Sequence, residues 1–440
     1  MDRRLPPSPA KDPILQHALR FVCSPFGFVE DAVRECGDVY RFELPGVDDT
    51  ITLVHPDQFR RVLVTDVESF GKTEDFRRAF GEGVLSVEGE QWRRQRRILQ
   101  PLFDRERIGG YADVMVECTE RRLERWSAGE SLKMEPEMKA LTLEILLATL
   151  FGRELRPGEG SELREAAEGL NDWFAPTSWI LPAWVPTPAR RRFRRSVARL
   201  RREVRELLAE GGTDASDTLD LLSRLRKARE PEDDRRLTRR EIEDQLITMV
   251  FAGHETTAST LSFAWYLLAT HPEAEARFHA ELDSVLGGRP PTREDLPELE
   301  YTRRVLEETL RLYPPVHTIP RLTLTDVEID GYDVPASREV HLSVIHAHRD
   351  DRFYDDPLQF RPERWVDGFE EELHDFAYAP FGGGRRTCIG REFALLEAQV
   401  VLATIGQRYA FDWEGGAELG LNPRVTIRSE NGIPLRIRAR

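Results

Sequence analysis

Apolar residues recur at three- and four-residue spacing through most of the chain after Asp57. The runs LTLEILLATLFG (residues 141–152) and IEDQLITMVFAG (residues 242–253) have this period, which is typical of helices with a buried face. Short strand-like runs occur at DVYRFELPG and DTITLVHP in the first 70 residues, and later at LTLTDVEIDGYDVP and VTIRSENGIPLRIR. The pattern therefore predicts a mainly helical protein with a small β portion.

One helix is expected to cross the whole molecule. Thr238 and Glu241 match a capping box before the apolar run, and Pro272 follows it. A helix of about 30 residues would be roughly 45 Å long. The stretch Leu246–Leu268 is apolar enough to raise a membrane span, but its segment FAGHETTAST contains an acid, a histidine and threonines that would be costly in lipid. We therefore expect a buried helix and no membrane span.

FAGHETTAST, at residues 251–260, is a polar interruption of this helix. From the helix alone, the plainer interpretation is structural. Thr256 would bond back to the helix backbone and Glu255 would form a buried ion pair. The segment needs a second observation before a functional interpretation is favoured.

Composition narrows the class of protein. The chain has 440 residues without a linker or repeat, so we expect a single domain over residues 1–440 with a proline-rich arm over residues 1–13. The net charge of -15 argues against nucleic acid as a partner. The four cysteines are far apart, which argues against a disulfide framework or a zinc site and favours the reducing cytoplasm. The N-terminus has no apolar segment typical of a signal peptide.

A single cysteine, Cys388, lies in an unusual context near the C-terminus. It follows three glycines in PFGGGRRTCIGREFALLEAQVVL and precedes an amphipathic helix. The glycines permit positive φ angles, so the loop can turn backbone N–H groups toward the sulfur. The N-terminus of the following helix would favour the thiolate. This context indicates a functional thiolate.

The loop resembles that of the cytochrome P450 family of haem-thiolate monooxygenases. The family pattern Phe-x-x-Gly-x-Arg-x-Cys-x-Gly is matched by Phe381, Gly384, Arg386, Cys388 and Gly390. The resemblance implies the cytochrome P450 fold, a haem b cofactor, and Cys388 as the axial thiolate of the haem iron, which favours O–O cleavage. It also implies that Phe381 packs near the sulfur and that the backbone at Gly390 passes close to the porphyrin; Gly382 is expected among the haem-contacting residues.

Two further motifs of the family occur in the expected order. ETLRLYPP contains Glu308 and Arg311 at a spacing of three, and RPERW contains Arg364. The resemblance implies that these three residues form a buried carboxylate–guanidinium network behind the haem. Its role would be structural, because breaking it would leave a buried charge unpaired.

The resemblance also implies partners for the two haem propionates. Trp92 and Arg96 lie four residues apart on one helix face, and Arg386 and Arg321 match further propionate-binding positions. Lys72, in SFGKTEDF, resembles a lysine with this role in some family members; the alternative is an exposed loop lysine.

The polar interruption matches the family's central-helix pattern through Ala252, Gly253, Glu255, Thr256 and Thr257. The resemblance implies that the Ala252 and Thr256 side overlies the haem, at a notch in the helix where O2 binds. Glu255 would relay protons from solvent and Thr256 would hold them at the oxygen. The histidine between the glycine and the acid is expected to face away and to have no role.

The resemblance implies insertion of one oxygen atom from O2 into a lipophilic substrate, such as a fatty acid, terpenoid or carotenoid. Electrons would come from a separate partner, a ferredoxin with its reductase. The alternatives are a peroxide-driven peroxygenase and a haem-thiolate sensor or ligand-binding protein without catalysis. The expected substrate-pocket residues are Phe76, Phe80, Val84, Leu85, Val250, Phe251, Val316, Thr318, Ile319 and Ile433.

Two surface features have two interpretations each. The first is the group Arg93, Arg94 and Arg97 in WRRQRR (residues 92–97), which forms either a docking site for an acidic electron donor or a solvated helix face. Residues 173–188 carry Trp173, Trp179 and Trp184 and precede a helix whose apolar face is Phe193, Val197, Leu200, Val204 and Leu207. The segment is either a connector with a solvated amphipathic helix, or a mobile apolar lid that contacts a membrane surface.

Overall fold

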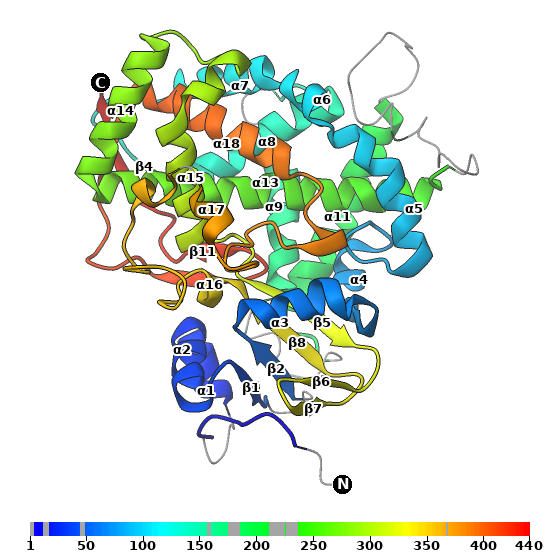
Figure 1. Cartoon of the computed structure of the whole chain (residues 1–440). Coiled ribbons are helices and arrows are strands. Elements are labelled where there is room, and N and C mark those ends of the chain that lie inside the picture. Colours follow the sequence, from blue (N-terminus) through cyan, green and yellow to red (C-terminus); the bar gives the residue numbers. More distant parts are fainter. Residues whose placement is uncertain are drawn as a thin grey trace.

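A computed structural model describes residues 4–11, 17–44, 49–155, 160–174, 185–210, 225, 236–366 and 368–440. Helices make up one side of the molecule, and a β-sheet with α1 and α2 makes up the other (Figure 1). The predicted class, mainly α with a small β portion, is confirmed. Of the predicted N-terminal arm, residues 1–3 and 12–13 lie outside the described residues; Pro7 O accepts a hydrogen bond from Arg41 N–H at 2.8 Å.

The long helices surround the centre of the molecule. They are α2 (Pro25–Cys36), α5 (Gly89–Leu99), α7 (Ala112–Leu123), α8 (Met134–Phe151), α11 (Pro188–Glu210), α13 (Arg239–Thr270), α14 (Pro272–Leu286), α15 (Glu300–Leu312) and α18 (Arg391–Gly406). The shorter helices are α1 (Ala18–Cys23), α3 (Pro56–Arg60), α4 (Glu74–Phe80), α6 (Arg105–Gly109), α9 (Ser161–Leu170), α16 (Val344–Ala347) and α17 (Phe369–Glu372). Single turns of 3-10 helix occur at Pro362–Arg364 and Gly384–Arg386, next to the site described below.

The main sheet has the order β1-β2-β8-β5-β3, with β2 and β8 parallel and the other neighbours antiparallel. Its strands are β1 (Val39–Phe42), β2 (Thr50–Leu53), β8 (Glu339–Ser343), β5 (Thr318–Thr323) and β3 (Phe70–Gly71). A second sheet joins β4 (Ser131–Lys133), β12 (Pro434–Ala439) and β9 (Tyr409–Trp413). Two hairpins pair β6 (Val327–Ile329) with β7 (Tyr332–Val334), and β10 (Leu421–Pro423) with β11 (Ile427–Ser429). Each predicted strand run contains at least one strand.

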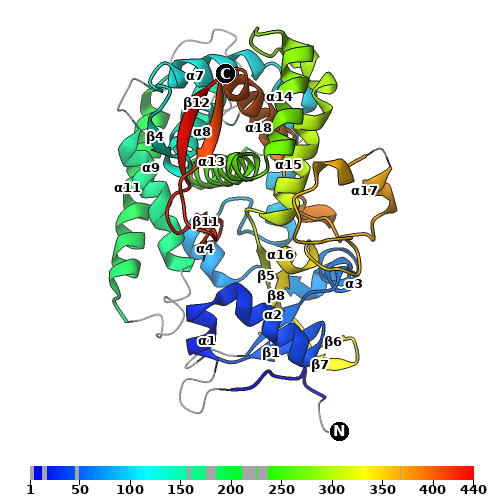
Figure 2. The same ribbon diagram turned by 90° about the vertical axis from the view of Figure 1, so that its left-hand side faces the viewer.

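The central helix α13 crosses the molecule as predicted and is seen nearly end on in Figure 2. Its capping box is formed: Glu241 N–H donates to Thr238 Oγ1 at 3.2 Å, and Thr238 N–H donates to Glu241 Oε2 at 2.8 Å. The helix is continuous through Gly253. A Cβ at this glycine would lie 2.7 Å from a δ-carbon of Leu146, so Gly253 allows α8 to approach α13 closely.

The predicted apolar face of α11 is buried inside the protein. Phe193, Leu200, Val204 and Leu207 are each 5% exposed or less, and α11 packs against α9 and α13. The face is therefore part of the core. Trp179 and Trp184 of the predicted lid lie outside the described residues.

Among the helices of the described ranges, none combines the length and the apolar character needed to cross a bilayer. This includes α13, as its polar interruption predicted.

Substituting the N-cap of α13 tests its contribution to stability. We expect Thr238→Ala to lower the free energy of unfolding by about 1 kcal/mol, because the Glu241 N–H loses its acceptor. Urea unfolding followed by circular dichroism measures the change. The matched control is Thr325→Ala, at an exposed turn position outside any helix or strand. An equal change for the two variants would contradict the capping role.

Candidate active site

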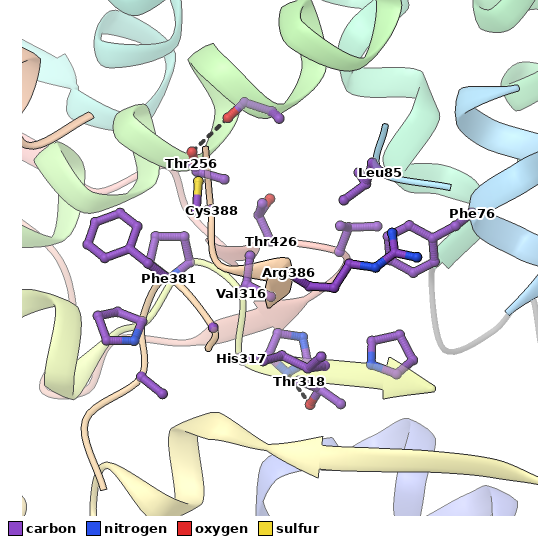
Figure 3. A pocket seen from close by; sticks show the side chains of 18 of the residues that line it. Phe76, Leu85, Thr256, Val316, His317, Thr318, Phe381, Arg386, Cys388 and Thr426 are labelled. Carbon is purple, nitrogen blue, oxygen red and sulfur yellow. Dashed lines mark hydrogen bonds between the residues drawn. The ribbon is translucent and has the colours of Figure 1, made fainter. Parts of the chain in front are cut away.

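A cavity of about 430 Å³ lies beside α13 in the part of the chain that the structure describes. Its walls come from α13, the cysteine loop, β5 and the hairpin β10–β11, and most of the wall area is apolar. Figure 3 shows Cys388, Thr256, Arg386 and Thr426 around this space. The cavity thus brings together motifs that are far apart in the sequence.

The cysteine loop is shaped by glycines and backbone hydrogen bonds. Cys388 lines the cavity, and its N–H donates to Phe381 O at 3.0 Å. Gly384 has φ +63°, and a Cβ there would lie 2.3 Å from Leu63 O, so no other residue fits without a shift of the backbone. Burial raises the pKa of the Cys388 thiol above its ordinary value, although a hydrogen bond from Gly390 N–H and the charge of Arg96 act in the opposite direction. Gly390 in the loop and Arg96 on α5 are therefore the groups that would stabilise a thiolate.

Three cations line one end of the cavity: Lys72, Arg321 and Arg386. Arg386 pairs with Glu88 through Nη2, while its buried Nη1 has no hydrogen-bond partner among the described residues. Burial and the neighbouring Arg386 charge lower the pKa of Arg321 to about 10 and that of Lys72 well below its ordinary value. Such a cluster is costly unless an anion shares the site.

Trp92 and Arg96 lie on one face of α5, as predicted. The Arg386 guanidinium stacks over the Trp92 ring at 4.4 Å. Arg96 Nη1 donates to Thr387 O at 3.0 Å and thereby holds the backbone next to Cys388. Both residues line the cavity.

These features fit a haem. A thiol faces an apolar cavity, and the cations at its end, with the unpartnered Arg386 Nη1, suit two propionates. Cys388 would bind the iron, while Lys72, Arg321 and Arg386 would bind the propionates. The walls between them contain Phe381, Gly382 and Gly390, as expected.

The structure joins Glu308, Arg311 and Arg364 in one buried network. Arg311 donates to both Glu308 oxygens at 2.8 Å, and neither side chain is exposed. Arg364 Nε donates to Glu308 Oε1 at 3.2 Å, and Trp365 Nε1 donates to Glu308 Oε2 at 2.8 Å. The indole of Trp365 is a partner that the sequence interpretation did not include, although it belongs to the RPERW motif.

On the opposite wall, α13 presents Ala252 and Thr256 to the cavity. The Thr256 hydroxyl donates to Ala252 O at 2.7 Å, which is the back-bonded arrangement of the plainer interpretation (Figure 3). Thr257 Oγ1 similarly donates to Gly253 O at 3.4 Å. A proton-handling role for Thr256 requires its hydroxyl to leave this bond.

Glu255 is fully buried and does not belong to the cavity wall. Arg428 Nε donates to its Oε1 at 2.8 Å, and Lys139 Nζ lies 3.6 Å from the same oxygen. Burial alone would raise the pKa of Glu255, but the charges of Arg428 and Lys139 outweigh it and lower the pKa to about 2. Glu255 is therefore held as an ion-paired carboxylate. His254 is also buried and lies off the cavity wall, with Nδ1 bonded to Val250 O.

Most of the predicted substrate residues line the cavity. They are Phe76, Val84, Leu85, Phe251, Val316, Thr318 and Ile319. Phe80 instead packs behind the wall against the Phe251 ring at 5.1 Å, and Val250 is buried in the core on the side of His254. Ile433 is also in the core, where its carbonyl accepts a hydrogen bond from Met134 N–H at 2.9 Å. These three residues do not line the cavity.

The C-terminal part of the wall is formed by Pro423, Arg424, Val425 and Thr426. The sequence interpretation recognised a strand-like run here but chose a residue beyond the second hairpin strand. Strand periodicity alone does not reveal which turn reaches the cavity, because that depends on packing against α13.

The basic run on α5 is largely neutralised by nearby acids. Arg93 and Arg97 pair with Glu90, and Arg94 pairs with Glu241 at the start of α13. This arrangement agrees with a solvated helix face. Docking of an electron donor on these arginines of α5 stays a proposal.

Comparison with known proteins identifies the family. The profile described as cytochrome P450 matches residues 6–431. The chain is 35% identical to cyclooctat-9-en-7-ol 5-monooxygenase of Streptomyces melanosporofaciens, over 91% of this chain and 88% of that protein. It is 33% identical to pentalenene oxygenase of Streptomyces avermitilis, over 98% and 97% of the two chains. The crystal structure of the cytochrome P450DA haem domain superposes with a TM-score of 0.87 at 27% identity, covering 100% of this chain and 98% of that one.

The fold and the cysteine loop define a haem-thiolate protein. The chain belongs to the cytochrome P450 family. It is a cytochrome P450 monooxygenase that binds haem b, and members of this family use O2 and electrons from a redox partner.

The buried network makes a sharp stability prediction. We expect Glu308→Ala to lower the free energy of unfolding by about 3 kcal/mol or more, because Arg311 would keep a buried charge without its carboxylate. The matched control is Glu300→Ala, which removes a surface ion pair with Arg304 on the same helix. This variant should change the free energy of unfolding by less than about 0.5 kcal/mol. Urea unfolding and haem content measure both. Similar effects for the two variants would rule out a special role for the network.

Proposed function

We propose that this monooxygenase inserts one oxygen atom from O2 into a lipophilic terpenoid, with electrons from a separate ferredoxin and its reductase. The observation that carries the proposal is the cavity itself, because most of its wall area is apolar. Phe76, Leu85, Phe251 and Val316 contribute apolar wall.

Uncharged polar groups in this wall include His317, Thr318 and Thr426. Burial lowers the pKa of His317 to about 4, so the ring is neutral at pH 7. Its Nε2 lies 2.9 Å from Arg424 O and its Nδ1 lies 3.0 Å from the Thr318 hydroxyl. Such a wall suits a hydrocarbon frame that carries a hydroxyl group.

The relatives support the same substrate class. Their names state oxidation of cyclooctat-9-en-7-ol and pentalenene, both of which are terpenoids. A third relative, cyclooctatin synthase of Streptomyces melanosporofaciens, is 34% identical over 96% of this chain and 93% of that protein. Fatty acids and carotenoids remain comparison ligands in the experiment below.

Haem bound through Cys388 would supply the iron centre at which O2 is activated. The chain's own residues would bind and orient this group: Arg386 and its neighbouring cations at the propionates, and the Gly390 N–H at the sulfur. The Thr256 hydroxyl would exchange its bond to Ala252 O for one into the cavity. It would then hold a proton donor at the reacting oxygen, resupplied through the Glu255 carboxylate.

A ligand screen with product analysis tests this function. The purified holoenzyme is titrated with cyclooctat-9-en-7-ol, pentalenene, palmitic acid and β-carotene, following the haem absorption band. Turnover is then measured with a surrogate ferredoxin, its reductase and NADPH, and products are identified by mass spectrometry. We expect cyclooctat-9-en-7-ol and pentalenene to bind most tightly and to gain one oxygen atom.

Other outcomes would replace the proposal. Comparable product formation with hydrogen peroxide alone would favour a peroxygenase. Tight binding without turnover by several ferredoxins would favour a sensor. Preferential hydroxylation of palmitic acid would change the substrate class.

Thr256→Ala tests the proton step. We expect product formed per NADPH consumed to fall by roughly tenfold, with hydrogen peroxide released instead, because the hydroxyl that holds the proton donor is missing. The matched control is Thr270→Ala, which removes a back-bonded threonine from the end of α13, away from the cavity. Unchanged coupling in Thr256→Ala would exclude Thr256 from proton delivery.

A further inference from the structure

The hairpin β10–β11 connects the substrate side of the cavity to Glu255. Its turn, Pro423 to Thr426, forms part of the wall, and the strand that follows continues to Arg428. A molecule that fills the cavity therefore meets the same short segment that carries the ion-pair partner of Glu255. Glu255 itself does not line the cavity.

Two side chains of this segment hold the same carboxylate oxygen. Thr426 Oγ1 donates to Glu255 Oε1 at 3.3 Å, and Arg428 donates to Oε1 through Nε at 2.8 Å, with Nη2 at 2.7 Å. Thr426 is the last residue of the turn and Arg428 lies two residues later on β11, and both side chains reach Glu255 on α13. Glu255 Oε2 has no hydrogen-bond partner among the described residues. The hairpin thus holds one oxygen of the carboxylate, while the other lies 3.8 Å from His254 Nε2.

The hairpin backbone is bonded on two sides. Ser259 Oγ, one turn beyond Glu255 on α13, donates to Ile427 O at 2.9 Å. On the other side, Ile427 N–H donates to Pro315 O at 2.9 Å. Together with the bond between His317 and Arg424 O, these contacts tie the hairpin to two segments of the cavity wall. Two of these bonds are made by Ile427, the residue next to Arg428.

Arg428 also lies between Glu255 and the surface. Its side chain is 18% exposed, whereas that of Glu255 is 1% exposed. Glu168 on α9 and Glu135 on α8 both stabilise the Arg428 charge, so acids other than Glu255 lie close enough to attract it. Movement of Arg428 toward Glu168 would uncover Glu255 and admit water along the vacated path.

We propose that Arg428 is a positioning residue that couples occupancy of the cavity to proton delivery. With the cavity free, Arg428 and Thr426 hold the Glu255 carboxylate together with Lys139, and Arg428 blocks water. A ligand that presses on Pro423–Thr426 displaces the hairpin, opens the Arg428–Glu255 pair and connects Glu255 to solvent. The inference rests on the proposed role of Glu255 in supplying protons to Thr256. It adds that the bound substrate determines when Glu255 can take up protons from solvent.

Hydrogen exchange tests this coupling directly. Backbone amide exchange of residues 424–429 is measured in the holoenzyme with and without saturating clotrimazole, whose binding is followed by the haem absorption band. The variants are Arg428→Gln, which removes the charge, and Arg428→Lys, which retains it. The matched control is Arg436→Gln on β12, an exposed arginine paired with Glu414. NADPH consumption without substrate is measured for each with the surrogate ferredoxin system.

We expect clotrimazole to accelerate exchange of these amides in the wild type by roughly fivefold or more. Fivefold is the low end of the effect that occupancy of one site typically has on another. Arg428→Gln should exchange fast without the probe, and its substrate-free NADPH consumption should rise by about fivefold. Arg428→Lys and Arg436→Gln should behave like the wild type. A merely structural arginine would not make the exchange independent of the probe.

Two results would overturn the inference. The first is amide exchange at residues 424–429 of the wild type that does not become faster when clotrimazole is bound. This result does not depend on whether any variant is stable. The second is Arg428→Gln with wild-type exchange and NADPH consumption. The reduced, carbon monoxide-bound absorption spectrum is recorded in parallel. If the wild type shows a normal thiolate signature, either of the two results refutes only the coupling through Arg428. If the wild type lacks the thiolate signature, the proposed function itself is refuted.

Discussion

The paired side chains of Arg311 and Glu308 hold together the part of the molecule on which the thiolate depends. Arg311 Nη1 donates to His348 O at 2.9 Å and to Pro357 O at 2.7 Å, and so binds the segment that follows β8 to α15. His348 Nε2 in turn accepts a hydrogen bond from Ala379 N–H at 2.8 Å, two residues before Phe381. Burial lowers the pKa of His348 to about 3, which keeps the ring neutral and able to accept. A continuous set of hydrogen bonds therefore runs from a buried ion pair to the cysteine loop.

Electrostatics divides the cavity into two functional ends. Lys72, Arg321 and Arg386 are gathered where burial opposes their charge. Glu88 offsets part of this charge by pairing with Arg386, and a bound anion would stabilise the cluster further. The wall near β5 instead carries the ring of His317, which is uncharged at pH 7. Glu255 lies off the cavity wall, and its charge is balanced by Arg428 and Lys139. The cation cluster of the cavity and the buried carboxylate of α13 are therefore separate electrostatic sites.

The sequence predicted those parts of the site that depend on local spacing. The capping box of Thr238, the helix face shared by Ala252 and Thr256, and the helical spacing of Glu308 and Arg311 follow from positions three or four apart. The cysteine loop was recognised because its glycines and Cys388 lie within one short segment of the sequence. Fold class followed from the same local periodicity, summed over the chain.

The parts that could not be predicted depend on contacts between distant segments. Arg428 lies 173 positions from Glu255, and no motif links them. Lys139 lies on α8, whose sequence pattern predicts a buried apolar face and gives no sign of a contact with Glu255. Ile433 was predicted to line the cavity, whereas Thr426 does so. The position of a short hairpin depends on what it packs against, so the sequence does not reveal which of its residues reach the cavity. Pairings of this kind arise only when the chain is folded, so local pattern does not contain them.

Gly384 has a further consequence for how the protein is made. Its lack of a side chain lets the cysteine loop rest against the Leu63 carbonyl, so the thiolate is positioned by a segment near the opposite end of the chain. The cavity wall likewise runs in sequence from Phe21 to Thr426. During synthesis, the early segments must therefore wait for almost the entire chain to leave the ribosome. The haem site cannot close on a nascent fragment, and loading of the cofactor becomes a late event in the life of the polypeptide.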